Sequence, residues 1–403
     1  MKSTALHQLF AIGLAALVAT LAACGGGGGG VGSGGTGQAM SAGSGTVTGL
    51  ASVIVDGIEF DDTHAEVLVE VAPGTFQEAT VSLGQSVEVQ YRGEAEAQTI
   101  RIDAAVVGPV TSVDAGAGRL QTMGQTVIVN DSADTGPITV FTGVGGLAAL
   151  NAGDAVEIHG VPRWNGTGYQ IHATRIERLA ALPARLRVSG IVQDLGATGF
   201  VVGGLTVQTA DATVVPAATT LADGQRVVVW AAQPAAGTAL VAQGVRVIER
   251  RGTAQAPAYL GGVVSRFDGA ARRFDVAGVS VRYGDATHIT PRGPQFQLGD
   301  GVYVQVTGTY GAGGGLDATR IKIRKTGADG FVQVELAGEI TDFAGVASFR
   351  LRGAQVDASA LSAPYPGCGN VALGNGRRVT VEGGYEARTG GSVVVASRLR
   401  CLN

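Results

Sequence analysis

The residues best suited to metal chemistry in this sequence are two histidines that flank a turn signal. His159 and His172 lie on either side of Asn165-Gly166, a dipeptide typical of two-residue hairpin turns. If these two residues form the turn, the histidines lie directly opposite each other on paired strands. Neighbouring imidazoles bind zinc, copper or nickel, with Glu157 as the candidate third ligand. The pattern permits a metal site, and the plainer interpretation is a solvated cross-strand pair.

A second group of chemically capable residues is the acidic run between residues 56 and 66. Oxygen ligands at this density can bind calcium, but the spacing and turn glycine of an EF-hand loop are absent. The alternation of Ile58 and Phe60 with polar residues predicts instead a strand with one solvated face. The members of the run are Asp56, Glu59, Asp61, Asp62, His64 and Glu66.

Sequence signatures of catalysis are weak. The histidines lie in no nucleophile-elbow, triad-like or metalloprotease motif, and the many carboxylates cannot be assigned to one cleft from sequence alone. An aromatic content of 5% and a formal net charge of −4 disfavour nucleic-acid binding. We predict no catalytic residues, no cofactor and no nucleic-acid partner.

The strands that must position these residues recur five times along the chain. Each repeat contains a Leu-x-x-Gly turn followed by an alternating strand, as in Leu298–Gly301 and Val302–Val304. A second alternating strand closes each repeat and carries an arginine, and successive arginines are 74, 71, 74 and 78 residues apart. Such a near-constant period indicates homologous units. The arginines are Arg101, Arg175, Arg246, Arg320 and Arg398.

Each repeat also opens with a glycine and a short strand, as in Gly45-Thr46-Val47. About five strands in roughly 70 residues suit a small closed barrel, because closure removes exposed strand edges. We therefore predict an all-β fold, a tandem array of five small five-stranded, OB-like β-barrels that follow a signal peptide and a flexible tether. The predicted segments are a signal peptide (1–23), a tether (24–43) and repeats 1 to 5 (44–105, 106–183, 184–250, 251–330 and 331–403).

The N-terminal residues have the features of an export signal. The apolar segment from Leu9 to Ala23 is too short for a permanent membrane span. Its end, Leu21-Ala22-Ala23-Cys24, resembles the lipobox of bacterial lipoproteins. The resemblance implies lipid on Cys24 and an anchor in the cell envelope, and Gly25 favours the outer membrane, facing the periplasm or the cell surface. An ordinary secretory signal with an incidental cysteine is the alternative. The following residues, rich in glycine and serine, predict a flexible tether.

Two cysteines remain if Cys24 is lipidated. Cys368 and Cys401 form an even pair in an exported chain, which predicts a disulfide bond. Such a bond ties a loop of repeat 5 to its last strand. Two free thiols are the alternative.

The glycine openings, the Leu-x-x-Gly-x-x-Val strands and the Ala-x-x-Ile terminal strands resemble an uncharacterised family of β-barrel repeats found in bacterial lipoproteins. The resemblance spans roughly residues 44 to 403 and implies export and fold type, without an activity. Repetition without a repeated polar constellation predicts a non-enzymatic envelope lipoprotein that presents a binding or scaffold surface to an envelope protein or polysaccharide. Metal binding by His159 and His172 is one alternative. A glycan-binding or glycan-acting protein with a cleft between repeats is the other.

Overall fold

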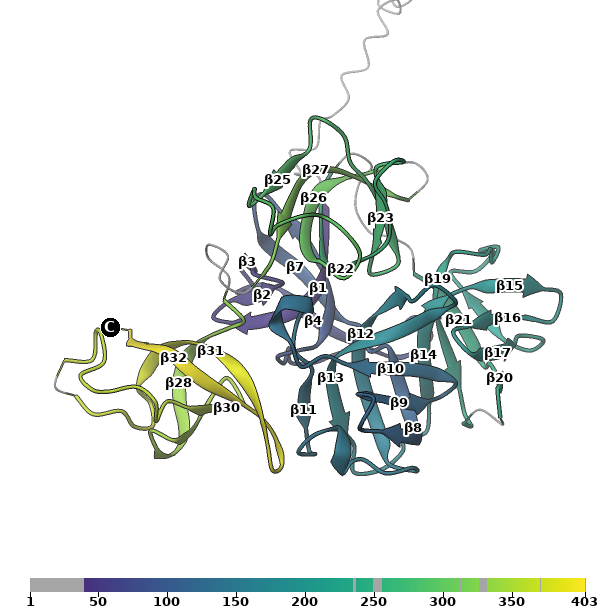
Figure 1. The fold of residues 1–403 in the computed structure, drawn as a ribbon. Coiled ribbons are helices and arrows are strands. Elements are labelled where there is room, and N and C mark those ends of the chain that lie inside the picture. The colour runs from purple at the N-terminus through teal and green to yellow at the C-terminus, as the bar shows by residue number, and fades with distance from the viewer. Residues whose placement is uncertain are drawn as a thin grey trace, which may run out of the picture. The chain divides into compact units, whose positions relative to one another are not determined.

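The computed structural model describes residues 40–234, 237–248, 256–311, 314–325, 332–369 and 371–402. These residues form β-strands and two short 3-10 helices, and this described part contains no α-helix (Figure 1). The predicted all-β fold class is therefore confirmed. None of the helical segments in these ranges is long and apolar enough to cross a membrane. The predicted signal peptide and Cys24 lie outside the described residues, and the first strand begins at Ser41, within the predicted tether.

The first two repeats contain thirteen strands between them, and both 3-10 helices lie in the second. Repeat 1 consists of β1 (Ser41–Leu50), β2 (Val53–Val55), β3 (Ile58–Phe60), β4 (Glu66–Ala72), β5 (Thr75–Glu78), β6 (Ser86–Arg92) and β7 (Glu96–Ile102). Repeat 2 consists of β8 (Val106–Asp114), β9 (Arg119–Thr122), β10 (Gln125–Val129), η2 (Ala133–Thr135), β11 (Val140–Thr142), η3 (Leu147–Ala149), β12 (Ala155–Trp164) and β13 (Tyr169–Arg178).

The remaining repeats follow the same order of short and long strands. Repeat 3 consists of β14 (Leu186–Ile191), β15 (Gln193–Gly196), β16 (Gly199–Val202), β17 (Leu205–Gln208), β18 (Thr213–Val215), β19 (Arg226–Ala231), β20 (Ala239–Val241) and β21 (Gly244–Val247). Repeat 4 consists of β22 (Pro257–Asp268), β23 (Arg273–Val276), β24 (Val279–Arg282), β25 (His288–Thr290), β26 (Tyr303–Tyr310) and β27 (Leu316–Ile323). Repeat 5 consists of β28 (Val334–Gly345), β29 (Ser348–Leu351), β30 (Ala354–Asp357), β31 (Arg378–Arg388) and β32 (Gly391–Cys401).

Strand pairing inside a repeat returns to the strand where it began. In repeat 5, β28 pairs with β29, β29 with β30, β30 in parallel with β32, β32 with β31, and β31 with β28. Repeats 2 and 4 have the same circuit. The long glycine-opened strand is common to both halves of the circuit because it pairs with the short hairpin on one side and the long hairpin on the other.

The repeats are not separate barrels, which corrects the sequence-based prediction. Strand β1 pairs in parallel with β22 of repeat 4 and with β28 of repeat 5. Strand β14 of repeat 3 pairs with β8 of repeat 2, and β11 meets β32. Twenty-eight strands thus belong to one hydrogen-bonded sheet, a continuous β-solenoid array. Sharing of strand edges stabilises repeats that are individually too small to bury a large core.

The apolar cores are shared in the same way. One buried cluster combines residues of repeats 1 and 5, including Val89 and Leu399. A second combines repeats 2 and 3, including Ile158 and Val229, and a third lies in repeat 4 around Leu260. The five repeats therefore form three hydrophobic cores among the described residues.

A two-residue turn in each repeat contacts a neighbouring repeat. These turns join two short strands of each repeat. In four of the five, both residues have the positive φ angles of a type I′ hairpin, as in Asp56 (48°) and Gly57 (80°), and in Gly203-Gly204 only the first residue does. In repeats 1 and 2 the side chain of the first turn residue folds back over the glycine that opens its own repeat. A Cβ atom on Gly45 would overlap the Asp56 carboxylate, and one on Gly108 would lie 2.5 Å from Met123 Cγ. The opening glycine therefore makes room for the turn side chain. The turns are Asp56-Gly57, Met123-Gly124, Gly203-Gly204, Ala277-Gly278 and Arg352-Gly353.

Candidate functional site

The predicted histidine pair does not form. Strand β12 is paired with β13 so that His159 lies opposite Arg175, while His172 lies opposite Val161. Two features shift the register. The loop spans four residues, because Asn165 N donates to Gly168 O at 3.1 Å, and a β-bulge lies between His159 and Gly160. The prediction that the two imidazoles face each other is therefore wrong.

Each histidine has its own environment instead. His159 is fully buried, its Nε2 lies 2.9 Å from Glu157 Oε1, and Ser86 N donates to its Nδ1 at 3.4 Å. Burial lowers the pKa of His172 to about 4, and the charge of Arg163 adds to this effect. No group of three or more His, Cys, Asp or Glu residues able to hold a metal occurs within the described ranges.

A buried charge network lies beside His159 and joins repeats 1 and 3. Arg187, whose side chain is 2% exposed, pairs with Asp103 and lies 3.8 Å from Glu70. Arg226 contacts Asp103 at 2.9 Å, and Arg246 contacts Glu70 at 2.7 Å. Burial opposes ionisation of Asp103, but the two adjacent guanidinium groups outweigh it and lower the carboxyl pKa. Each buried charge has an opposite partner, so the network is structural.

Asp56 is buried in the turn between β2 and β3, whereas the sequence pattern predicted a strand through this position. Its side chain is 1% exposed, accepts a hydrogen bond from the Tyr303 hydroxyl and accepts another from Thr46 N at 3.0 Å. Gln305 Nε2 donates to the Asp56 carbonyl. Burial raises the carboxyl pKa to about 6, although the hydrogen bonds from Tyr303 and Thr46 and the charge of Arg324 favour the charged form. The prediction fits the neighbouring Glu59, which is exposed, but at Asp56 the turn is covered by repeat 4.

One concave site is a cleft of about 730 Å³ between parts of repeats 1, 2 and 5. We call it the arginine cleft, because four arginines and, among the residues that the structure describes, no aspartate or glutamate line it. Its volume is within the range typical of pockets that bind small-molecule ligands. The lining residues are Leu50, Ser82, Leu83, Val140–Gly143, Arg175, Ala347, Ser348, Arg350, Arg352–Gln355, Tyr385 and Arg388–Val394.

Two hairpins of repeat 5 build most of the arginine cleft. One is β29–β30, whose turn is Arg352-Gly353. The other is β31–β32, whose tip reaches β11 of repeat 2, where Thr142 pairs with Gly391 and Phe141 N donates to Ser392 Oγ at 2.9 Å. The cleft is thus walled by regular strands rather than by long loops, which favours a preformed site.

The four arginines differ in how well their charge is compensated. Arg175 contacts Glu177 at 2.8 Å, and Arg388 contacts Asp357 at 2.8 Å. Arg350 donates to the Gly353 carbonyl at 2.7 Å and lies 3.5 Å from Asp342, a carboxylate that is 74% exposed. Arg352 Nε donates to the Leu50 carbonyl at 3.2 Å, and it pairs with no carboxylate of the described residues.

The cleft also has hydroxyl, amide and aromatic groups. Ser348 Oγ accepts from Gln355 Nε2 at 3.1 Å, and the buried Tyr385 hydroxyl has no hydrogen-bond partner among the described residues. Burial raises the Tyr385 pKa well above its usual value, so the hydroxyl stays a donor. The arrangement can bind polar and anionic groups. It offers no carboxylate pair for acid–base hydrolysis of a glycoside.

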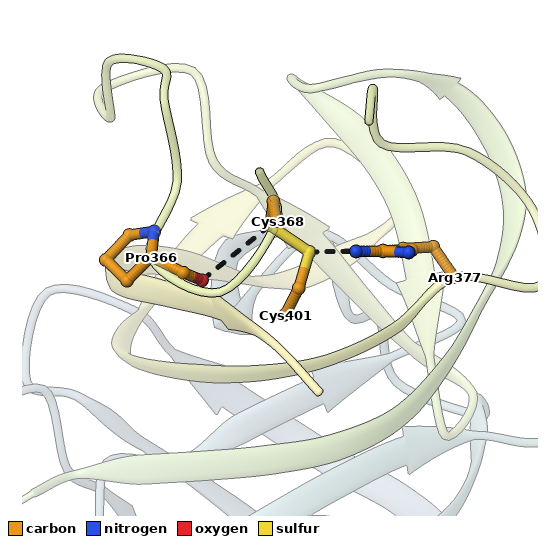
Figure 2. The surroundings of a disulfide bond; sticks show 4 residues. All are labelled: Pro366, Cys368, Arg377 and Cys401. Carbon is orange, nitrogen blue, oxygen red and sulfur yellow. Dashed lines mark hydrogen bonds between the residues drawn. A yellow bond between two sulfur atoms is a disulfide. The ribbon is translucent and has the colours of Figure 1, made fainter. Parts of the chain in front are cut away.

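Cys368 and Cys401 form a disulfide bond in the structure, as the cysteine count predicts (Figure 2). Their Cα atoms are 4.9 Å apart. Cys401 N donates to the Pro366 carbonyl at 2.9 Å, and Arg377 Nε donates to Cys401 Sγ at 3.3 Å. The bond attaches the loop before β31 to the end of β32.

Sequence reasoning did not find the arginine cleft. A usable signal was present, because Arg352-Gly353 occupies the same place in repeat 5 as Asp56-Gly57 in repeat 1. Alignment of the five turns would have identified Arg352 as a side chain aimed at a neighbouring repeat.

Comparison with known families gives a match in the middle of the chain. Residues 107–177, 189–246 and 261–322 each match the family described as Domain of unknown function (DUF5666). Three segments of the array are therefore similar to one repeated domain type, whose description assigns no activity. A comparison with curated proteins found no match.

Proposed function

We propose that this chain is a non-catalytic glycan-binding protein of the bacterial cell envelope, and that the arginine cleft holds a segment of polysaccharide. The observation that carries the proposal is the lining of the cleft. Guanidinium, hydroxyl and amide groups line about 730 Å³, and no described residue of the lining carries a carboxylate. These groups suit the hydroxyl-rich surface of a sugar chain.

A glycan fits this cleft better than a peptide does. Peptides commonly bind by adding to an open strand edge, by laying an apolar helix face into a groove, or on aromatic platforms. Both hairpins of the cleft have their strands paired within repeat 5, and only Phe141 and Tyr385 are aromatic. The absence of lining carboxylates also favours binding over hydrolysis.

Anchoring belongs to the same proposal. The lipobox-like Leu21-Ala22-Ala23-Cys24 supports lipid on Cys24, and the glycine-rich segment after it supports a tether between membrane and array. A Cys24→Ser variant is then expected to leave the membrane fraction and to lose metabolic labelling with radioactive palmitate. Retention of the label by this variant would refute the anchor.

The cleft is tested by blocking it. The full chain, purified in detergent, is assayed on immobilised polysaccharides with Ser348→Trp, an exposed strand residue that lines the cleft. Ser280→Trp is the matched control, because Ser280 is an exposed strand residue of repeat 4 outside the lining. We expect the first variant to lose glycan binding and the control to keep it. Equal polysaccharide binding by both variants would refute the proposal. A chain that binds peptides but no polysaccharide would also refute it.

A further inference from the structure

We propose that Arg350 and Arg352 form a carboxylate-binding pair, so that the glycan taken by the arginine cleft is an acidic one built of uronate units. This inference rests on the proposed function and adds the chemistry of the ligand. It begins from the turn that repeat 5 presents to the cleft.

The turn of repeat 5 differs from its equivalents in exposure. Asp56, Met123 and Ala277 occupy the first turn position in repeats 1, 2 and 4, and they are 1%, 2% and 7% exposed. Arg352 occupies the same position and is exposed. Its stem lies over Gly338, where an added Cβ would be 3.2 Å from Arg352 Cγ. Repeat 5 thus places a charged head at a position that other repeats use for packing.

The guanidinium of Arg352 is only partly used by the protein. Its Nε donates to the Leu50 carbonyl at 3.2 Å, which fixes the direction of the side chain. Within the described part of the chain Arg352 has no ion pair, whereas Arg350 and Arg388 each have one. A guanidinium held by one backbone contact keeps a planar fork of donors that matches the two oxygens of a carboxylate.

Arg350 lies two residues earlier on the same hairpin. It is held by the Gly353 carbonyl at 2.7 Å, and its one carboxylate partner, Asp342, is 3.5 Å away and largely exposed. Exposed pairs of this kind contribute little free energy. A ligand carboxylate can therefore replace Asp342 at small cost.

The remaining arginines set the background charge. Arg175 and Arg388 are paired with Glu177 and Asp357, so they position the cleft walls rather than offer free donors. No lining carboxylate repels an anion. The donors left for a ligand are therefore concentrated at Arg350 and Arg352, beside the amide of Gln355.

The experiment compares one glycan with and without its charge. The probes are polygalacturonate, alginate and hyaluronate, together with fully methyl-esterified polygalacturonate, and the protein is the full chain in detergent. We expect the wild-type chain to bind polygalacturonate at least tenfold more tightly than the ester, and to lose affinity with rising salt. The Arg350→Gln/Arg352→Gln variant is expected to lose that preference. Arg272→Gln/Arg273→Gln makes the same change of net charge at exposed arginines outside the cleft and is expected to keep it.

The outcomes separate the two proposals. Equal binding of the acid and the ester, both blocked by Ser348→Trp, would leave a glycan-binding cleft and overturn the carboxylate pair. Failure of the wild-type chain to bind any uronate polymer would also overturn the pair. An equal loss in both arginine variants would assign the effect to net charge rather than to the cleft. Thermal unfolding of each variant verifies that it is folded. The Arg350→Lys/Arg352→Lys variant keeps the charge but loses the planar fork of donors, and it is expected to bind polygalacturonate with intermediate affinity.

Discussion

The buried carboxyl of Asp56 makes the stability of the protein depend on pH in an unusual direction. In Asp56→Asn the side chain keeps its size, and its amide can still accept from Thr46 N and donate to the Tyr303 hydroxyl oxygen. What changes is the charge, because the asparagine is neutral at every pH. The variant therefore isolates the free energy of ionising one buried group between repeats 1 and 4.

The sign follows from the proton bound by each state. The folded carboxyl has a pKa of about 6, whereas its unfolded value is 3.8. Between these values the folded state binds more protons than the unfolded state, so the free energy of unfolding falls as pH rises. The fall is complete above about pH 6 and amounts to about 3 kcal/mol for a shift of about two units. The Asp56→Asn variant does not lose this free energy of unfolding, because its side chain has no proton to release.

Urea unfolding of both chains, followed by circular dichroism from about pH 3.5 to about pH 7, measures the effect. The variant is expected to gain about 3 kcal/mol relative to the wild-type chain across this interval, with most of the gain between about pH 4 and pH 6. Asp131→Asn, at an exposed aspartate, is the control and should show no such pH-dependent gain. A difference that stays constant with pH, or that favours the wild-type chain at neutral pH, would refute the reasoning.

Three further predictions concern the packing of the array. Arg187→Leu should reduce the free energy of unfolding by about 3–5 kcal/mol in denaturant titrations, because it leaves two carboxylates without their central partner; a loss below about 1 kcal/mol would contradict this role. Gly45→Ala should cost about 1–3 kcal/mol, since its Cβ overlaps the turn side chain above it, and an unchanged melting temperature would show that the turn can move aside. Cys368→Ser should destabilise repeat 5 by up to about 4 kcal/mol, because the bonded cysteines are 33 residues apart. Limited proteolysis of this variant should then cut first near residue 370. Proteolysis that begins in another repeat would argue against a local effect.

The repeat period and the alternation of apolar residues predicted most of the strands. The sequence showed a glycine at the start of each repeat but not why a glycine is needed there. The reason is spatial, because a side chain of the turn folds over this glycine, as at Gly45 and Gly108. Register failed at Asn165-Gly166 because a four-residue loop and a bulge look the same in sequence as a two-residue turn. A dipeptide such as Asn-Gly can indicate that a turn is present without specifying how many residues the loop contains.

Contacts between repeats explain the other differences. The alternation from Asp56 to Asp61 indicates a strand, whereas Asp56 lies in a turn that contacts Tyr303 of repeat 4. The three residues that matter most in the cleft, Arg350, Arg352 and Gln355, come from one hairpin, but the opposite wall comes from repeats 1 and 2. Nothing local in the sequence indicates which repeats become neighbours. The disulfide could be predicted from the even pair of cysteines that remains after Cys24, together with the expectation of export, without knowledge of the geometry.

The core shared by repeats 1 and 5 has a consequence for how the chain reaches its folded state. Strand β1 pairs with β28, whose residues lie almost three hundred positions later in the chain. The pairing of the first described strand is therefore complete only when repeat 5 is present. Contacts of such long separation slow folding, and they leave apolar strands of repeat 1 open in the meantime. A chain is synthesised from its N-terminus, so repeat 1 is made before its partner repeat. Repeat 1 therefore lacks part of its core until repeat 5 is made, and a chain truncated after repeat 4 is expected to lose the core of its first repeat as well as its last.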